Sequence, residues 1–344
     1  MEKGARYKLK IIENVSLKNL NTFKIDVKAK FFCEVTNKED ILELSDEGFF
    51  KKKWIILGGG SNVLFLDDFD GIVIKNRISG FEELLKDEEK VIIKANSGEL
   101  WDVFVDYCVT NSFYGAENLS LIPGTVGASP IQNIGAYGTE VSEIIFSVEY
   151  FDIKSKSFRT IEKSLCEFGY RESIFKNDLK NKTIITSVNF KLSVKPNYKL
   201  IYKPLSDIFA DKEKRSLSEI RNKIIEIRTS KLPDTDVFGN AGSFFKNPEI
   251  TPDEFERLKR EYPDIVSFKT ESGNVKISAG WLIEKTGLKG FKKGNVGTYN
   301  QQALVILNFG GAKGNEIIQF SEFISAEVLN MFKINLTPEV NIIY

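Results

Sequence analysis

The chain has 344 residues, of which 42% are hydrophobic and 28% are charged, so length and composition predict a globular protein of two or three domains. Its 48 basic and 48 acidic residues cancel, which excludes the positive field expected of a protein that binds nucleic acid or a membrane surface. The chain contains no histidine, which excludes a histidine general base, a histidine metal ligand and a flavin linked through histidine.

Signals for export, membrane insertion and metal binding are missing from the sequence. The N-terminal residues lack the apolar segment of a signal peptide, and no run of about 18 apolar residues occurs. Cys33, Cys108 and Cys166 are far apart and form no Cys-x-x-Cys pair, so neither a disulfide framework nor a zinc site is predicted. We therefore expect a cytoplasmic protein that holds no metal.

The first part of the chain predicts a helix and several strands. Residues 1–20 are expected to be peripheral or poorly ordered. Thr36 and Glu39 form a capping-box pattern, which predicts the start of a short helix. Three apolar runs predict strands, the first of them buried, at residues 54–57, 72–75 and 91–95.

A glycine turn follows the first of these strands. Residues 58–62 read Gly-Gly-Gly-Ser-Asn, and the successive N–H groups of such a turn can converge on an anion. The turn lacks the spacing of a dinucleotide-binding fingerprint and the lysine of a P-loop. Taken alone, it is either a phosphate cradle or a tight connection between strands.

A helix is predicted after Ser97, followed by strands at residues 147–153 and 183–192. The apolar residues that fall on one face of this helix are Leu100, Val103, Phe104, Tyr107 and Cys108. We therefore interpret Cys108 as a core residue and not as a nucleophile. Strands that alternate with one helix and long glycine-rich loops predict an α+β domain and not a doubly wound sheet.

Residues 117–140 form a long loop that is rich in glycine and poor in charge. Glycine allows backbone N–H groups to approach a ligand closely, and Asn118, Gln132 and Asn133 add fixed amide dipoles. Ordering such a loop is costly unless something binds in it. We interpret it as a wall for a large, partly planar and partly phosphorylated ligand; a structural Ω-loop is the alternative.

Two polar residues are candidates for chemistry. Arg171 follows a Gly-Tyr turn signal, although a surface arginine paired with Glu172 or Glu167 explains it as well. Ser243 lies among small residues and amides at residues 239–248. Without a histidine base we do not expect a hydrolase-type nucleophile; a donor of a proton or hydrogen bond is favoured, and a turn serine is the alternative.

The C-terminal part of the chain predicts further helices and strands. A capping box at Ser216 and Glu219 precedes a helix that Pro233 stops, which suggests a domain boundary near residue 231. Its core-facing residues are Leu217, Ile220, Ile224 and Ile227. Further helices are predicted to start at Thr251-Pro252 and at Ser278, the second closed by Gly287.

The last residues predict a strand, a long helix and a β-like tail. The strand is expected at residues 301–307 and the tail at residues 338–344, with Glu339 and Asn341 on one side of it and Val340 and Ile342 on the other. The stripe of the long helix is Ile317, Phe320, Ile324, Val328 and Met331.

Together these stretches resemble UDP-N-acetylenolpyruvoylglucosamine reductases, which are flavoenzymes of peptidoglycan precursor synthesis. Nine segments occur in the family's order and cover most of the chain from about residue 20 onward. They are residues 21–23, 57–65, 117–140, 169–175, 231–234, 239–248, 278–290, 302–305 and 338–340. Residues 202–205 resemble the longer subtype, in which a tyrosine-bearing loop lies over the substrate site.

The resemblance implies an α+β chain with the two-part FAD-binding fold of the vanillyl-alcohol-oxidase type and a C-terminal α+β substrate-binding domain. The implied domains are residues 1–75 with the strand at 335–344, residues 76–230, and residues 231–334. The partners implied are small molecules only, namely a nucleotide sugar and NADPH, and we expect a monomer.

The implied reaction has two halves: NADPH reduces FAD, and the reduced flavin passes hydride from N5 to C3 of the enolpyruvyl group. Charge then builds at C2 and in the carboxylate, and must be stabilised electrostatically. By resemblance, Arg171 binds that carboxylate, Glu339 stabilises or polarises the same intermediate, and Ser243 protonates C2.

The resemblance also implies binding residues. Those for FAD are Leu57, Gly58, Gly59, Gly60, Ser61, Asn62, Asn118, Ile122, Pro123, Gly124, Val126, Gly127, Ala128, Ser129, Gln132, Asn133, Gly135, Ala136, Tyr137 and Gly138. Those for the substrate are Tyr170, Tyr202, Lys231, Asn247 and Gln302.

The chain departs from the family pattern in three places. Tyr299 and Asn300 lie in a stretch where a histidine is common, and Asn341 stands where an arginine is usual. Gly59 stands where some members have glutamate, a difference that we expect to be neutral.

Two alternative functions remain open. One is an FAD-dependent oxidase on the same fold, although such oxidases often tether flavin through histidine and need neither Ser243 nor Glu339. The other is a non-catalytic flavoprotein that binds a nucleotide sugar, although all three catalytic residues are retained.

Overall fold

The computed structural model describes residues 8–210, 216–270 and 272–344. They fall into two compact units. Unit 1 contains the described residues of 1–15, 29–59 and 70–228, and unit 2 contains residues 16–28, 60–69 and the described residues of 229–344. The three-domain division implied by the resemblance stays a prediction.

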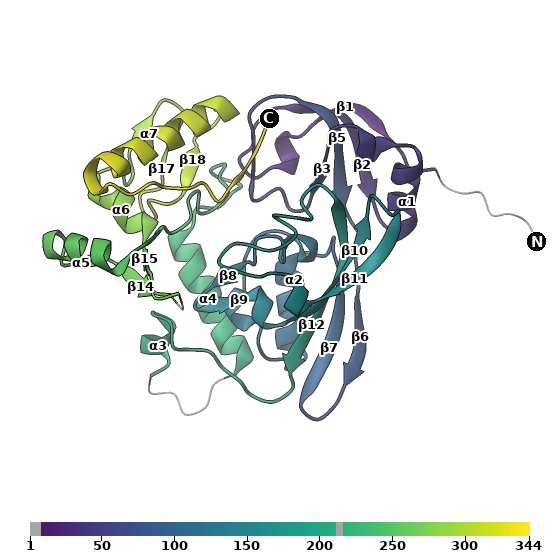
Figure 1. The fold of residues 1–344 in the computed structure, drawn as a ribbon, viewed down its shortest axis with the longest axis horizontal. Coiled ribbons are helices and arrows are strands. Elements are labelled where there is room, and N and C mark those ends of the chain that lie inside the picture. The colour runs from purple at the N-terminus through teal and green to yellow at the C-terminus, as the bar shows by residue number, and fades with distance from the viewer. Residues whose placement is uncertain (1–7, 211–215, 271) are drawn as a thin grey trace, which may run out of the picture. The chain divides into compact units, whose positions relative to one another are not determined.

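In the described part of unit 1, five strands form an antiparallel sheet in the order β11-β10-β12-β7-β6 (Figure 1). They are β6 (Phe81–Lys86), β7 (Lys90–Asn96), β10 (Ile145–Asp152), β11 (Ser157–Glu162) and β12 (Thr183–Ser193). The three inner strands confirm the predicted ones. The two edge strands, β6 and β11, were not predicted, because none of their residues is buried and neither contains an apolar run.

Helix α2 (Trp101–Thr110) covers this sheet with a face that differs from the predicted one. Leu100 and Val103 are 54% and 45% exposed, so their assignment to the core was wrong. The buried residues of the helix are Trp101, Phe104, Val105, Cys108 and Val109. This set has the same spacing as the predicted one, shifted by one residue. Cys108 is confirmed as a core residue, and burial raises the pKa of its thiol.

A second sheet, ordered β1-β2-β5-β3, carries the glycine turn at the end of one strand. Its strands are β1 (Ile12–Ser16), β2 (Lys28–Val35), β3 (Trp54–Leu57) and β5 (Phe69–Asn76), and helix α1 (Lys38–Asp46) follows β2. Residues 1–20 were expected to be peripheral or poorly ordered; β1 is ordered but peripheral, as an exposed edge strand, and residues 1–7 lie outside the described part. Strand β3 is confirmed, but it is an edge strand in which only Leu57 is buried. The cap of α1 is the pair Asn37 and Asp40, and not Thr36 and Glu39.

Unit 1 also contains short elements and the helix that leads out of it. These are β8 (Gly135–Ala136), β9 (Thr139–Glu140), α3 (Leu205–Ile208) and α4 (Leu217–Lys231). Among the described residues, short 3-10 helices occur at η1 (Lys18–Leu20), η2 (Phe49–Lys51), η3 (Glu117–Leu119), η4 (Val126–Ala128), η5 (Val141–Glu143) and η6 (Lys163–Leu165). The Ser216–Glu219 cap and the buried stripe of α4 are confirmed.

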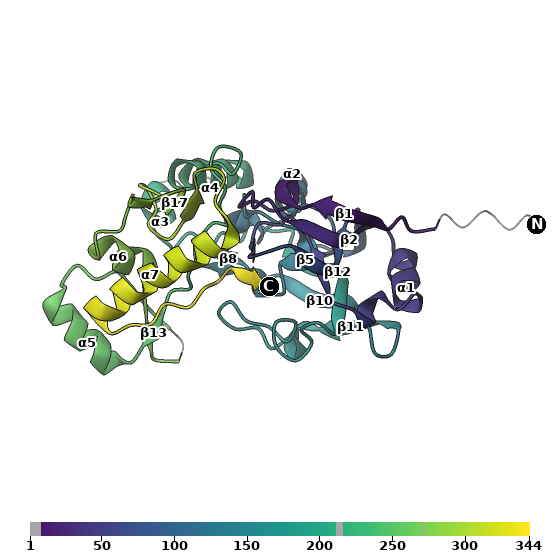
Figure 2. The same cartoon turned by 90° about the horizontal axis from the view of Figure 1, so that it is seen from above.

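Unit 2 is built from small sheets and three helices, of which α7 (Gly314–Phe332) is the longest (Figure 2). The other helices are α5 (Pro252–Glu261) and α6 (Ala279–Lys285). The strands are β4 (Val63–Phe65), β13 (Glu249–Ile250), β14 (Ser267–Lys269), β15 (Val275–Ile277), β16 (Lys292–Lys293), β17 (Val296–Thr298), β18 (Ile306–Asn308) and β19 (Asn341–Ile343). Strand β19 pairs in parallel with β4, which confirms the β-like tail.

Two predictions in unit 2 need correction. The strand expected at residues 301–307 starts only at Ile306, because the N–H of Val305 turns back to the carbonyl of Gln302. In α7, Met331 is 46% exposed, whereas Phe332 is 1% exposed and takes its place in the buried stripe. The cap at Thr251 with Pro252 and the helix between Ser278 and Gly287 are confirmed.

No helix within the described residues is both long and apolar enough to cross a bilayer.

An ion-pair cluster joins α4 to α2 within unit 1. The Arg221 guanidinium donates to both carboxylate oxygens of Asp102 at 2.7 and 2.8 Å and to Asp106 at 3.2 Å. Burial on its own would raise the pKa of Asp102, but the hydrogen bonds from Arg221 and from the Leu121 N–H hold that pKa below its ordinary value. The cluster therefore stabilises the folded state whenever Asp102 is ionised.

We expect Arg221→Met to lower the free energy of unfolding by about 2 kcal/mol, because it leaves the partly buried Asp102 carboxylate without its cation. Urea unfolding monitored by tryptophan fluorescence measures this. Since the folded-state pKa of Asp102 is depressed, its contribution is present above the unfolded pKa of about 3.9 and is lost as the pH falls through the folded value. The two proteins should therefore converge in acid. Lys223→Met, which breaks the exposed 2.7 Å pair with Glu226 on the same helix, should change the stability by about 0.5 kcal/mol or less.

Candidate active site

The glycine turn and the glycine-rich loop meet backbone to backbone inside unit 1. A Cβ atom on Gly59 would lie 2.9 Å from the Cα of Gly124, and one on Gly58 would lie 2.5 Å from Oγ1 of Thr125. Neither position leaves room for a side chain. Two segments implied to bind the same cofactor are thus brought together, and glycine is what allows it.

The second half of the turn belongs to unit 2. Gly60 has φ of +69°, and its carbonyl accepts the N–H of Thr22 at 3.0 Å. The Thr22 hydroxyl also donates to the carbonyl of Asn240 at 2.6 Å. Asn341, the departure from the family's arginine, donates its N–H and its Nδ2 to the carbonyl of Asn62 at 3.1 and 3.0 Å. Asn341 therefore holds the turn.

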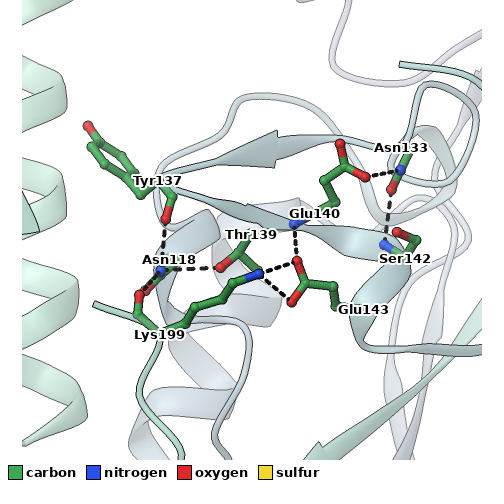
Figure 3. Close-up of polar contacts among 8 residues, drawn as sticks. All are labelled: Asn118, Asn133, Tyr137, Thr139, Glu140, Ser142, Glu143 and Lys199. Carbon is green, nitrogen blue, oxygen red and sulfur yellow. Dashed lines mark hydrogen bonds and ion pairs between the residues drawn. The ribbon is translucent and has the colours of Figure 1, made fainter. Parts of the chain in front are cut away.

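Asn118 fixes one end of the glycine-rich loop (Figure 3). Its Nδ2 donates to the carbonyl of Tyr137 at 3.1 Å, to Oγ1 of Thr139 at 3.2 Å and to the carbonyl of Lys199 at 2.7 Å. The residue is 2% exposed, and its Oδ1 accepts no hydrogen bond from the described residues. A buried acceptor without a partner is unusual in a folded protein.

Asn133 braces the middle of the loop and is fully buried. Its Nδ2 donates to Glu140 at 2.7 Å and to the carbonyl of Gly169 at 3.0 Å, while its Oδ1 accepts the N–H of Ser142 at 3.0 Å (Figure 3). Its amide is therefore used within the protein. The assignment of Asn133 to the FAD-binding set stays a prediction.

Helix α2 clamps the start of the loop. Trp101 donates its N–H to the carbonyl of Gly124 at 3.1 Å and its indole N–H to that of Leu119 at 2.8 Å. Asp102 accepts the N–H of Leu121 at 2.5 Å, and Leu121 has φ of +59°. These bonds fix a backbone conformation that leucine seldom adopts on its own.

Arg171 lies against the same loop. Its guanidinium donates to the carbonyl oxygens of Asn133 and Gly135 at 3.1 and 2.9 Å, and it lies 5.5 Å from the centroid of the Tyr170 ring. Its own φ is +58°, a left-handed value that is rare for arginine. The cation therefore sits at the edge of the predicted flavin wall, which the resemblance implied and composition did not reveal.

Tyr202 lies over the C-terminal end of the loop. Its ring meets that of Tyr137 edge to face, with centroids 6.3 Å apart, and its Cβ would be 3.2 Å from a Cβ on Gly138. Tyr202 is still 36% exposed. Within unit 1 the structure thus brings Tyr202 to two of the residues implied to bind FAD.

Unit 2 brings Ser243 and Glu339 close together. Glu339 donates its N–H to the carbonyl of Phe244 at 2.7 Å, directly after Ser243, and Phe244 donates its own N–H to Leu304 at 2.9 Å. Ser243 is exposed and Glu339 is half-buried. Arg171 belongs to unit 1, so the three catalytic candidates do not share one unit.

Asn247 and Gln302 both lie at the first turn of α6. Asn247 Oδ1 accepts the N–H of Ala279 at 2.9 Å. Oε1 of Gln302 lies 2.9 Å from where a Cβ on Gly280 would be. Lys231, at the end of α4, is exposed. In the described residues, no group of three metal-ligating side chains is arranged to hold a metal ion.

Sequence reasoning missed several residues that build the site. Asp102 and Arg221 gave no signal, because each lies on a helix and meets the other only in the fold. Lys75 did give one: it is a lysine at the end of an apolar strand, and it is 8% exposed.

Comparisons with known proteins match both parts of the chain. Residues 29–160 match the family described as FAD binding domain, and residues 233–343 match the one described as UDP-N-acetylenolpyruvoylglucosamine reductase, C-terminal domain. Two relatives are named UDP-N-acetylenolpyruvoylglucosamine reductase. The Flavobacterium johnsoniae protein is 43% identical over 97% of this chain and 100% of its own length. The Porphyromonas gingivalis protein is 42% identical over 97% and 99%.

A solved structure supports the fold. The reductase of the same name from Thermus caldophilus superposes with a TM-score of 0.66 at 23% identity, covering 97% of this chain and 99% of that chain. At this identity the likeness concerns the fold alone.

We expect Gly59→Ala to lower the free energy of unfolding by about 1–3 kcal/mol, because the added Cβ meets the backbone of Gly124 and not a movable side chain. Urea unfolding measures this, and the result would correct the expectation that a side chain at Gly59 is neutral. Gly169→Ala is the matched control in the same unit: its Cβ would make an ordinary 3.7 Å contact with Glu172. Equal stability of the two variants would refute the steric argument.

Proposed function

The chain belongs to the UDP-N-acetylenolpyruvoylglucosamine reductase family, and we propose that Arg171, Ser243 and Glu339 carry out its reaction with NADPH as the reductant. It is an FAD-dependent oxidoreductase that reduces the enolpyruvyl group of UDP-N-acetylglucosamine enolpyruvate in peptidoglycan precursor synthesis. The observation that carries this function is identity above 40% to reductases of this name over nearly the whole chain.

The residues present fit FAD. Gly58 and Gly59 leave no room for a side chain, the N–H of Gly59 donates to no acceptor among the described residues, and the buried Oδ1 of Asn118 is an unused acceptor there. When bound, FAD supplies the hydride transfer that links NADPH to the enolpyruvyl carbon. The protein supplies position and charge.

Arg171 is proposed to bind the substrate carboxylate. Its guanidinium presents donors in a planar fork, which suits a carboxylate that gains charge during the reaction. Two of those donors hold the carbonyl groups of Asn133 and Gly135, and this supports a fixed orientation at the edge of the loop. A cation held in advance costs no reorganisation when charge develops.

Ser243 is proposed to protonate C2, with Glu339 stabilising the intermediate that receives the proton. A serine hydroxyl is a weak acid, but it can serve as a donor when the acceptor is strongly basic. The exposure of Ser243 and the hydrogen bond that joins the neighbouring Phe244 to Glu339 support a shared role. The lack of histidine removes one common proton donor from the chain.

Tyr170, Tyr202, Lys231, Asn247 and Gln302 are proposed to bind the nucleotide sugar, with Tyr202 at its UDP part. The position of Tyr202 over Tyr137 and Gly138 supports this for the longer subtype. We also propose the three-domain division, a monomer, and a location in the cytoplasm. Three buried free thiols are consistent with a reducing compartment.

Arg171→Ala, Ser243→Ala and Glu339→Gln should each leave reduction of bound FAD by NADPH intact and slow sugar-dependent reoxidation by about 10²–10⁴-fold, as removal of an acid or a charge stabiliser does. Anaerobic stopped-flow spectra measure both halves separately: NADPH bleaches the flavin first, and the enolpyruvyl sugar is added second. Ser155→Ala, an exposed serine in the turn between β10 and β11, is the matched control and should reoxidise like the parent protein.

Each alternative gives a different spectrum. A protein that bleaches but ignores the sugar is another flavin oxidoreductase, such as an oxidase, and a protein that FAD cannot reconstitute is a binding protein at most. If reoxidation survives in all three variants, the residue roles are wrong although the function stands.

A further inference from the structure

Lys75 is a buried amine beside the glycine turn. It lies in β5 opposite Leu57 of β3, it is 8% exposed, and its Nζ donates to the carbonyl of Gly58. No carboxylate of the described residues lies within ion-pair distance of it. The charge is therefore compensated in this unit by a carbonyl dipole alone, which is costly for a buried ammonium.

The peptide that Lys75 holds has a free donor on its other side. In a trans peptide the carbonyl and the N–H point in opposite directions, so fixing the carbonyl of Gly58 also fixes the N–H of Gly59. That N–H donates to no acceptor within the described residues. A side chain on Gly59 would collide with Gly124, so only backbone groups are available at this position.

We propose that Lys75 is a positioning residue for the diphosphate of FAD. It fixes the Gly58–Gly59 peptide so that the Gly59 N–H is presented to a phosphate oxygen, and it places one positive charge behind that peptide. The chain from ammonium to carbonyl to N–H to phosphate is polarised in one direction, so each bond strengthens the next. The proposal rests on FAD binding by this family.

The charges around Lys75 are few. Burial lowers its pKa most, Arg77 beyond the end of β5 lowers it further, and Glu34 on β2 raises it. Arg77 and Glu34 pair with each other at 3.3 Å and are about half exposed. A phosphate at the Gly59 N–H, on the other side of the peptide from Lys75, favours the charged form of Lys75. FAD affinity should therefore fall as the pH rises through the lowered pKa of Lys75.

The test is FAD affinity of the full-length apoprotein, measured by quenching of flavin fluorescence. Lys75→Met should weaken FAD binding about five- to tenfold, as the loss of one charge-assisted interaction predicts. It should leave the affinity for riboflavin, which lacks the diphosphate, unchanged. The apoprotein should be as stable in urea as the parent or more so, because methionine fills the same space without a buried charge.

Two further variants keep the test decisive. Lys75→Gln retains a donor but no charge, so its affinity deficit should shrink as the pH is raised and the parent loses its own charge. Arg77→Gln removes an exposed charge two residues away and should change FAD affinity less than twofold. The proposal is overturned if Lys75→Met binds FAD like the parent, or if FAD and riboflavin weaken equally. A parent protein that does not bind FAD would instead refute the family function.

Discussion

The approach of two backbones at Gly59 and Gly124 is the constraint on which the candidate site depends. A Cβ on Gly58 or Gly59 would push the turn and the loop apart. The loop can stay this close because α2 clamps its first residues, while Asn118 and Asn133 brace the rest. Glycine makes the approach possible, and buried amides keep it from fluctuating.

The lack of histidine shapes how charge is used. Arg171 donates hydrogen bonds to the carbonyl groups of Asn133 and Gly135, which orient its guanidinium. Ser243 and Glu339 come from a backbone ladder in the other unit, where Asn341 and Asn62 hold the C-terminal strand to the glycine turn. The cation proposed to stabilise the developing charge and the hydroxyl proposed to deliver the proton thus come from different units of the chain. A site built in this way relies on electrostatic positioning and not on a titrating base.

The sequence predicted most helices and strands, but it did not predict which side chains meet in the folded protein. The inner strands β7, β10 and β12 were predicted from their apolar runs, whereas the exposed edge strands β6 and β11 contain no such run. For α2 the predicted spacing was right, but the predicted face was shifted by one residue. Apolar residues occupy both sets of positions, so Leu100 and Val103 fit the helical period as well as Trp101 and Val105 do. The glycine segments and the family residues were read from motifs. The roles of Asp102 and Arg221 are set by tertiary neighbours that no local pattern encodes, whereas Lys75 could have been noticed as a lysine at the end of an apolar strand.

Two buried cations in unit 1 are compensated in different ways, and the difference indicates what each is for. Arg221 has both carboxylate oxygens of Asp102 and a second carboxylate from Asp106, so its charge is matched within the fold and its effect is on stability. Among the described residues, Lys75 has only the carbonyl of Gly58 as a hydrogen-bond partner. A fold selected for stability alone would gain from an apolar residue there, because burying an unmatched ammonium is unfavourable. A charge that the protein leaves unmatched, next to a donor that it leaves unused, is best explained by an anion that arrives from outside the chain.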